Sequence, residues 1–433
     1  MSPDHAPNTT IEKPRGAWGL LRDRTFGSFF AARLCTSIGT WLFSVVAAIA
    51  AFDATHSAVA VGIVSFVQFT PQLVLGPLSG KWADRGSVKR QMLIGRAICA
   101  TGSISLAVWF FVGVAADGWT HVWVVTAASL VVGVGLVVGG PAMQSGVPLL
   151  VTREELPAAM ALNTAPLTIG RIAGPALGAL ATAGFGYEFA FIVSGIAHLA
   201  FMALVAWIAF PAPKGRQKGD EFSIREALRF VKADRPTLLI LMGVTALGFG
   251  SEPTVTLAPP LAAELDGGTA AVGALTSSMG VGAAVGVVVM SVLAARVRND
   301  TFGAIGIVIM AVGLGSCVAP LGLQTAMAGF ALTGLGFIMS ISSLSTLLQV
   351  RLPPALRGRV MALWLMGFVG ARPVGAILVG MISDLWSVHA AFACVATVLL
   401  GCAVLCRPSR LLNARVSPDA QPGLAPPAIP TDQ

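Results

Sequence analysis

Long apolar segments recur along the whole chain, and they constrain its fold more than any other feature. A bilayer-spanning helix needs about 20 mostly apolar residues. Of the 433 residues, 55% are hydrophobic and 11% are charged, whereas an average soluble domain has about 25% charged residues. So little charge could not cover a water-soluble surface, and we predict an all-α membrane protein with twelve transmembrane helices. The predicted spans are 27–51, 58–80, 91–115, 122–148, 158–184, 187–210, 236–258, 270–293, 302–319, 322–346, 358–382 and 387–406.

One long polar break divides these spans into two groups of six. It predicts a cytoplasmic segment (1–26), a first six-helix bundle (27–210), a cytoplasmic linker (211–235), a second bundle (236–406) and a disordered cytoplasmic tail (407–433). Within the linker, Ser223 and Glu226 form a capping box that opens a short amphipathic helix. We expect this helix to lie on the inner membrane surface as a connector, rather than to act as a calmodulin-type target peptide.

An internal repeat relates the two groups of spans. Met160-Ala161-Leu162 followed by Arg171 and Gly174 recurs, at the same spacing, as Met361-Ala362-Leu363 followed by Arg372 and Gly375. A weaker echo matches Val61-Gly62 to Val272-Gly273. Repeats of this kind in secondary transporters place the substrate path between the two halves, near the middle of the membrane. The repeat therefore predicts two pseudo-symmetric six-helix bundles.

Charged residues between the spans predict the orientation. The outer connections contain acids and no Lys or Arg, whereas the bases gather on the other side, so both termini are expected in the cytoplasm. The net charge of +8 thus marks the cytoplasmic face and does not indicate nucleic-acid binding. The outer acids are Asp53, Asp117, Glu188, Glu264 and Asp266. The inner bases are Lys13, Arg15, Arg22, Arg24, those of 81–96, Arg153, those of 211–235, Arg296, Arg298, and those of 351–359 and 407–415.

Three further features set the membrane context. The polar N-terminal stretch has no cleavable signal peptide, so the first span is expected to be the insertion signal. All six cysteines fall in apolar runs without a Cys-x-x-Cys pair, which predicts no disulfide, metal site or cofactor. Five tryptophans near predicted span ends suit the membrane interface: Trp82, Trp119, Trp123, Trp207 and Trp386.

The polar run between the second and third spans carries the first family resemblance. Gly80, Asp84, Arg85, Lys89 and Arg90 stand in a pattern that resembles the loop between the second and third helices of the major facilitator superfamily. Ser87 and Val88 replace residues usual in that pattern. A carboxylate here can face the N-terminus of a neighbouring helix, so Asp84 and Arg85 are expected to gate the inner side. The second-half counterpart, residues 294–300, lacks the matching Gly and Asp, which predicts one-sided gating.

A second motif lies in the fifth span. Gly170, Arg171, Gly174, Pro175 and Gly178 can serve tight helix packing alone, because glycines at this spacing allow close backbone approach. They also resemble the antiporter motif of exporters in the superfamily, with Ala179 in place of its last glycine. The resemblance favours export over uptake.

Ionisable residues inside spans are costly and are therefore candidates for function. Arg33 stands alone in the first span and is expected either to face the cavity or to pack structurally. Arg171 and Arg372 lie halfway along the fifth and eleventh spans. They can take part in gating or bond backbone carbonyls released by Pro175 and Pro373.

Glu252 is the main candidate for proton coupling. It lies in Gly248-Phe249-Gly250-Ser251-Glu252-Pro253, where Gly and Pro can loosen the seventh span. A desolvated carboxyl there would suit a group that gains and loses a proton in each cycle; the alternative is an acid in contact with outer water. His198, in the sixth span, is either a second proton carrier or a neutral, hydrogen-bonded helix residue.

Taken from about Phe26 to Arg407, the chain resembles the drug:proton antiporter branch, similar to the enterobactin exporter and macrolide efflux pumps. Many members carry an Arg in the fourth span, and residues 122–148 contain none. The resemblance rests on Ser37-Ile38-Gly39, Trp41-Leu42, Ala58-Val59-Ala60-Val61-Gly62, Gly140-Pro141-Ala142 and the stretch 156–163.

The combined prediction is a multi-pass exporter of the bacterial inner membrane that works as a monomer. It would move an amphipathic small molecule, a siderophore or a drug, outward by alternating access in exchange for protons. A lipid or lysolipid flippase and a non-transporting membrane sensor stay open as alternatives. An enzyme is not predicted, because no nucleophile stands with a base and no phosphate-binding loop is present.

Overall fold

The computed structural model describes residues 15–211, 224–293, 296–319, 321–352 and 354–412, and within these ranges the chain is helical with no strand. The first half contains α1 (Ala17–Arg22), α2 (Arg24–Thr55), α3 (Ala58–Arg85), α4 (Val88–Val112), α5 (Gly118–Gly146), the short 3-10 helix η1 (Val147–Leu149) and α6 (Leu156–Ala206). The second half contains α7 (Ile224–Ala233), α8 (Arg235–Ser251), α9 (Pro253–Thr256), α10 (Ala258–Glu264), α11 (Gly268–Leu293), α12 (Asn299–Gly315), α13 (Leu323–Arg351), α14 (Pro354–Leu385), α15 (Val388–Leu405) and α16 (Pro408–Leu412).

The described residues account for all twelve predicted spans. Ten helices are long and apolar enough to cross a membrane. One of them, α6, has 51 residues and breaks at Gly186, whose φ of 87° lies in a region that suits glycine, so α6 supplies two spans. The apolar helix α12 is shorter, with 17 residues, and supplies the last. The predicted all-α, twelve-helix membrane fold is confirmed.

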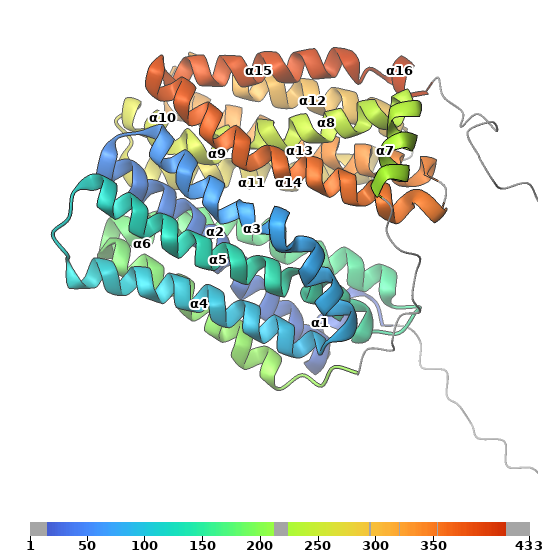
Figure 1. Ribbon diagram of the computed structural model, residues 1–433, viewed down its shortest axis with the longest axis horizontal. Helices are drawn as coiled ribbons and strands as arrows, with labels where there is room; N and C mark the ends of the chain where they lie inside the picture. The colour runs from blue at the N-terminus through green and yellow to red at the C-terminus, as the bar shows by residue number, and fades with distance from the viewer. Residues whose placement is uncertain (1–14, 212–223, 294–295, 320, 353, 413–433) are drawn as a thin grey trace, which may run out of the picture.

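The spans form two bundles that pack side by side (Figure 1). The first is built from α2 to α6 and the second from α8 to α15. They meet where α3 packs on α14 and α6 packs on α11, and we call this surface the seam. At the seam a Cβ added to Gly62 would lie 2.6 Å from the carbonyl oxygen of Ala376, and one added to Gly380 would lie 2.7 Å from that of Ala58. The helices therefore approach one another backbone to backbone.

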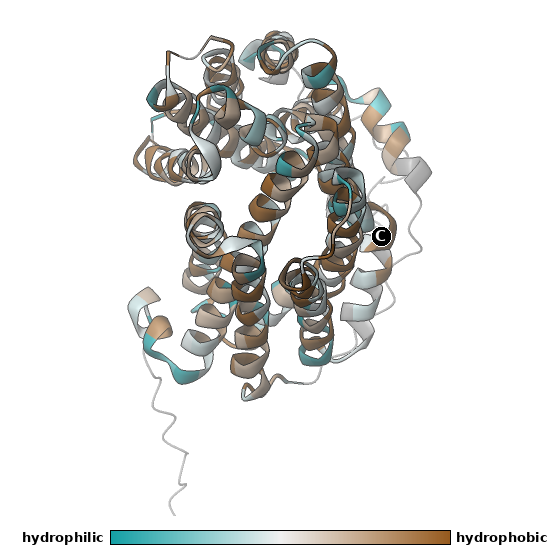
Figure 2. Ribbon diagram, turned by 90° about the vertical axis from the view of Figure 1, so that its left-hand side faces the viewer, coloured by the Kyte–Doolittle hydropathy of each residue, from teal (hydrophilic) through white to brown (hydrophobic). Residues whose placement is uncertain are grey.

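The outside of the bundles carries an apolar belt. Exposed valine, leucine, isoleucine and phenylalanine side chains line α4, α6, α11 and α15, and Figure 2 shows hydrophobic colouring along most of the helices. The tryptophans predicted for the interface, Trp82, Trp119, Trp123, Trp207 and Trp386, are all exposed at or beside helix ends. A surface of this kind is expected in lipid.

The seventh span lies close to its predicted extent of 236–258, because Arg235–Thr256 is one segment of membrane-spanning length. Within it, the helix α8 ends at Ser251, and α9 begins at Pro253, so Glu252 lies at a break. Pro253 has no backbone N–H to continue the helical bonds. The chain then goes on through α10 to Glu264. The helix is thus interrupted where Gly and Pro were expected to loosen it, and the break places Glu252 between two helices.

Both ends of the described chain lie at the same end of the bundles, which we call the terminal end (Figure 1). Here Arg15 Nε and Nη2 donate to the two carboxylate oxygens of Glu155, at 2.6 and 3.0 Å. The guanidinium of Arg15 lowers the pKa of Glu155 to about 2. The pair ties the N-terminal segment to the start of α6.

The structure describes one of the predicted polar segments and not the others. The amphipathic connector is seen as α7, which packs on α8 and α14. The capping box falls on Ser223 and the Glu226 side chain, which lie outside the described residues, as does the chain after Leu412.

Candidate functional site

A buried ion pair lies in the second half, next to the seam. Arg372 Nε, in α14, donates to Glu252 Oε1 at 2.6 Å. The Glu252 side chain is fully buried, and its Oε2 has no hydrogen-bond partner among the described residues. The alternative of an acid in contact with outer water is therefore wrong for this structure. A proton arriving at Glu252 would remove the charge that holds Arg372.

Arg372 also reaches across the seam. Its guanidinium carbon lies 4.0 Å from the ring centroid of Phe69, in α3 of the first half. A cation over an aromatic face is attracted to it. Arg372 therefore has one partner in each half, and its contacts differ from the predicted bonds to backbone carbonyls.

Arg171 occupies the matching place in the first half, with different partners. Its guanidinium lies 4.7 Å from the ring of Trp41 in α2 and 5.3 Å from that of Phe337 in α13 of the second half. No carboxylate forms an ion pair with it in the described part of the chain. By the Val-Gly echo, Trp41 corresponds to Glu252. The two halves thus hold equivalent arginines, one on a ring and one on an acid.

The glycines of the fifth-span motif pack α6 against α2. A Cβ added to Gly174 would lie 2.6 Å from the Cβ of Trp41, and one added to Gly178 would lie 3.1 Å from the Cγ of Leu42. Gly170 faces Ser37 in the same way, and Pro175 is buried inside α6. In the second half, Gly375 packs α14 against Phe249 of α8. The motif therefore sets how Arg171 is presented to Trp41, and its repeat does so for Arg372 and Glu252.

The loop motif is described only in part. Gly80 lies within α3, and the side chains of Asp84 and Arg85 lie outside the described residues. Lys89 Nζ donates to the carbonyl of Ala206 at 2.6 Å, and Arg90 is exposed. Their gating role stays a prediction.

At the other end of the seam, Asp384 joins the two halves. Its carboxylate, at the end of α14, accepts from the backbone N–H groups of Ala58 and Val59, at 2.7 and 3.1 Å, and from the hydroxyl of Ser57. These groups form the N-terminus of α3, where a negative charge is favourable. The sequence analysis missed this contact, because two helix ends from different halves must be placed together before it is visible.

A second polar cluster lies inside the first bundle. Arg33 is 4% exposed and donates to the carbonyl of Met143 at 2.9 Å. Arg96 is 1% exposed, so its predicted place among the inner-surface bases was wrong. Its position within the predicted span 91–115 was the signal that it would be buried. His198 is fully buried and bonds through Nδ1 to the Thr36 hydroxyl at 2.9 Å.

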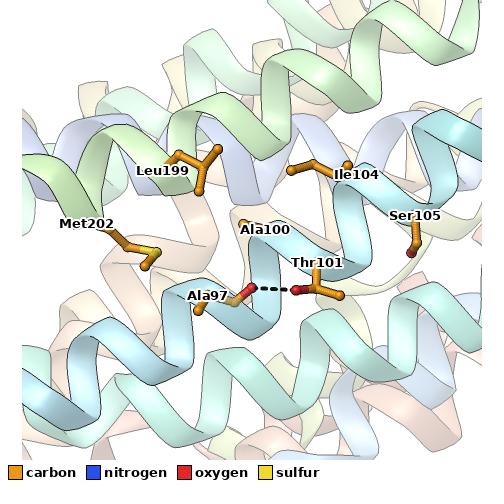
Figure 3. A pocket seen from close by; sticks show the side chains of 7 residues that line it. All are labelled: Ala97, Ala100, Thr101, Ile104, Ser105, Leu199 and Met202. Atoms are coloured by element: carbon orange, nitrogen blue, oxygen red, sulfur yellow. Dashed lines mark hydrogen bonds between the residues drawn. The ribbon is translucent and has the colours of Figure 1, made fainter.

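A groove on the outside of the first bundle has a different character. It has a volume of about 420 Å³, and Figure 3 shows its seven lining side chains on α4 and α6. The one bond drawn between them runs from the Thr101 hydroxyl to the carbonyl of Ala97, at 3.0 Å. The lining is Ala97, Ala100, Thr101, Ile104, Ser105, Leu199 and Met202. None of these is charged, and no group of side chains able to hold a metal ion occurs among the described residues.

Comparisons with known proteins decide the family. A profile described as "Transmembrane secretion effector" matches residues 15–427. The chain belongs to this family of the major facilitator superfamily. It is therefore a membrane transporter and not an enzyme.

Individual relatives and solved structures of other proteins agree with this assignment to the major facilitator superfamily. The chain is 27% identical over 367 residues to the enterobactin exporter EntS of Citrobacter koseri, covering 82% of this chain and 84% of that one. It is 27% identical to EntS of Salmonella typhimurium, with the same coverage. Among solved structures, a bacterial homologue of the human lysosomal transporter Spinster, inward-facing and unoccupied, aligns with a TM-score of 0.72 at 13% identity, covering 92% of this chain and 99% of that one. A D-xylose-proton symporter aligns with a TM-score of 0.66 at 16% identity, covering 87% and 97%.

Proposed function

We propose that the protein exports a small amphipathic organic molecule by alternating access, in exchange for protons. The observation that supports this most is the Glu252–Arg372 pair, because a fully buried carboxylate is held by one cation at a break between helices. Such ionisable groups are costly in a membrane and mark proton or substrate pathways. The relatives named enterobactin exporter support a siderophore as cargo, and a drug is the other candidate.

The coupling would follow from charge at Glu252. The ionised form holds Arg372 in the second half, beside the seam. Protonation releases the guanidinium, which then keeps only its contact with Phe69 of the first half. The balance of contacts across the seam therefore changes with each proton. Since α14 and α3 form part of that seam, the change can bias the rocking of one bundle against the other.

The arrangement of contacts supports a state closed at the end opposite the termini. Asp384 joins the halves there, and the Ser277 hydroxyl donates across the seam to the carbonyl of Ile172 at 2.7 Å. We propose that the terminal end faces the cytoplasm of a bacterial cell, in the inner membrane. In that orientation the described state would accept cargo from the cytoplasm. A monomer would suffice for transport.

Transport by membrane vesicles tests this proposal. Inside-out vesicles are acidified in the lumen, and uptake of enterobactin and of a hydrophobic cationic dye is followed with the wild type and with Glu252→Gln. We expect the variant to lose gradient-driven uptake and to keep exchange between labelled and unlabelled cargo. Glu264→Gln, at an exposed acid of the same half, is the control and should behave as the wild type. Unchanged driven uptake in Glu252→Gln would exclude Glu252 from coupling, and no uptake of either compound would count against export.

The flippase alternative has one observation in its favour, the apolar groove between α4 and α6 (Figure 3). The same two helices carry exposed apolar side chains such as Val108 and Ile196, as expected of a surface in lipid. A path for a lipid headgroup needs basic residues at its mouth, and the lining contains none. The exporter therefore stays our conclusion.

A further inference from the structure

We propose that Arg33, Arg96 and His198 form a binding site for a small anion inside the first bundle, separate from the Glu252–Arg372 pair. The three residues come from α2, α4 and α6. At most 4% of each residue is exposed. The site would hold a halide or a single carboxylate group.

The first argument is charge. Arg33 and Arg96 are close enough for their charges to repel, and neither forms an ion pair with a carboxylate among the described residues. Aromatic rings compensate part of this positive charge. The ring centroid of Phe29 lies 5.9 Å from the guanidinium carbon of Arg33, and that of Phe201 lies 5.9 Å from the guanidinium carbon of Arg96. Two buried cations without an acid are costly inside a membrane, so a bound anion would stabilise this part of the fold.

The second argument is the direction of the hydrogen bonds. Arg96 Nη1 donates to the Thr36 hydroxyl at 3.0 Å, since a guanidinium can only donate. The Thr36 hydroxyl can then give its own hydrogen to Nδ1 of His198, 2.9 Å away. In that tautomer the proton of the neutral imidazole is on Nε2. The chain of bonds runs from Arg96 through Thr36 to His198.

Two hydrogen-bond donors take no part in this series of bonds. Arg96 Nε and His198 Nε2 are buried and have no hydrogen-bond partner in the described part of the protein. Each carries an N–H, so the partner that would satisfy it must be an acceptor. Unsatisfied buried donors are rare in folded proteins. Positive charge together with unused donors and no acceptor is the chemistry that recognises an anion.

The third argument is the close approach of Gly139 of α5 to the guanidinium. An added Cβ would be 3.2 Å from Arg96 Nη2 and 3.4 Å from Nε. A side chain at this position would therefore press on the Nε that has no hydrogen-bond partner. The cluster also differs from the groove of Figure 3: Ala97 and Leu199 line that groove, whereas Arg96 and His198 are buried and are not part of its lining.

Thermal unfolding of the purified full-length protein tests the site. In lipid nanodiscs at constant ionic strength, a bulky organic sulfonate such as HEPES is replaced stepwise by chloride, and in a second series by acetate. We expect the wild-type Tm to rise by about 3 °C or more and to saturate. Saturation with chloride assigns an inorganic anion, and saturation with acetate alone assigns an organic acid group such as one on the cargo.

Three variants complete the test. Arg96→Gln removes a charge and should abolish the rise, and Gly139→Ala, which keeps every charge, should reduce the apparent affinity at least about tenfold by crowding the space. Arg24→Gln, at the exposed start of α2, is the control and should keep the full response. A wild-type Tm indifferent to both anions, or a rise that survives in Arg96→Gln and Gly139→Ala, would overturn the proposal. Because this readout is binding, it stands or fails independently of proton-driven export.

Discussion

The two halves of the protein place equivalent arginines at the seam and give them different partners. Arg171 of the first half lies on the ring of Trp41, and Arg372 of the second half pairs with Glu252. Both arginines also touch a phenylalanine of the opposite half. A ring holds a cation at every pH, whereas a carboxylate holds it only while ionised. The same scaffold thus has one permanent contact and one that a proton can release.

The largest expected effect comes from removing the cation of the second half. Arg372→Gln removes the cation that is hydrogen-bonded to the buried Glu252 carboxylate, which should cost about 3–5 kcal/mol of unfolding free energy. Adding Glu252→Gln to this variant should recover about half of the loss, since no charge is then left alone. Denaturant unfolding in detergent measures both, with exposed Arg296→Gln as a control near zero. A loss in the double variant equal to the sum of the losses in Arg372→Gln and Glu252→Gln would show that the two residues do not depend on each other.

The second effect concerns the carboxylate that the second half supplies to the seam. Asp384→Asn removes the negative charge at the N-terminus of α3, worth about 1 kcal/mol there. The end opposite the termini should therefore be open about five times more often. Distances between spin labels at Trp119 and Trp386 report this opening, and Asp266→Asn is the control at an exposed acid. An unchanged distance distribution would mean that Asp384 does not hold the halves together.

Much of the fold could be predicted because its cause is local. A span needs only a run of apolar residues, and the repeat of Arg171 and Arg372 is visible in the sequence. The course of the chain after Glu252 could not be predicted, because Pro253 shows that a helix can break but leaves open how the chain continues. It resumes as α9 and α10, whose packing on α11 depends on the tertiary structure.

The site could be predicted only as a set of separate residues. Scarcity of charge in the spans pointed to Glu252, Arg171 and Arg372, yet the Glu252–Arg372 bond joins residues 120 positions apart. Phe69 and Asp384 gave no signal of their own, because their roles depend on which helix of the other half lies opposite. Residue type and position indicate which groups matter, and the packing of the bundles decides which of them meet.

A comparable effect tests the permanent contact of the first half, between Arg171 and Trp41. Trp41→Leu removes the ring under Arg171 and should cost about 1–2 kcal/mol, whereas Trp41→Phe keeps a ring and should cost about half as much. The pH dependence of transport should stay as in the wild type for both, unlike that of Glu252→Gln. Exposed Trp123→Leu serves as the control. A shifted pH profile in Trp41→Leu would contradict the division of roles between the halves.

The smallest effect concerns the ion pair between Arg15 and Glu155 in the first half. Glu155 has its pKa lowered to about 2 by Arg15, and Arg15 is partly exposed, so water limits the contribution of the pair to about 0.5–1 kcal/mol. A carboxyl whose folded pKa lies below its ordinary value stabilises the fold above that ordinary value, near 4.5, and loses the effect as the pH falls toward 2. The gap in unfolding free energy between wild type and Arg15→Gln should therefore be constant from about pH 8 to 5 and shrink in more acidic buffer. If this difference in unfolding free energy instead narrows between pH 8 and 6, a group other than Glu155 interacts with Arg15. The first half would then also have a proton-sensitive contact.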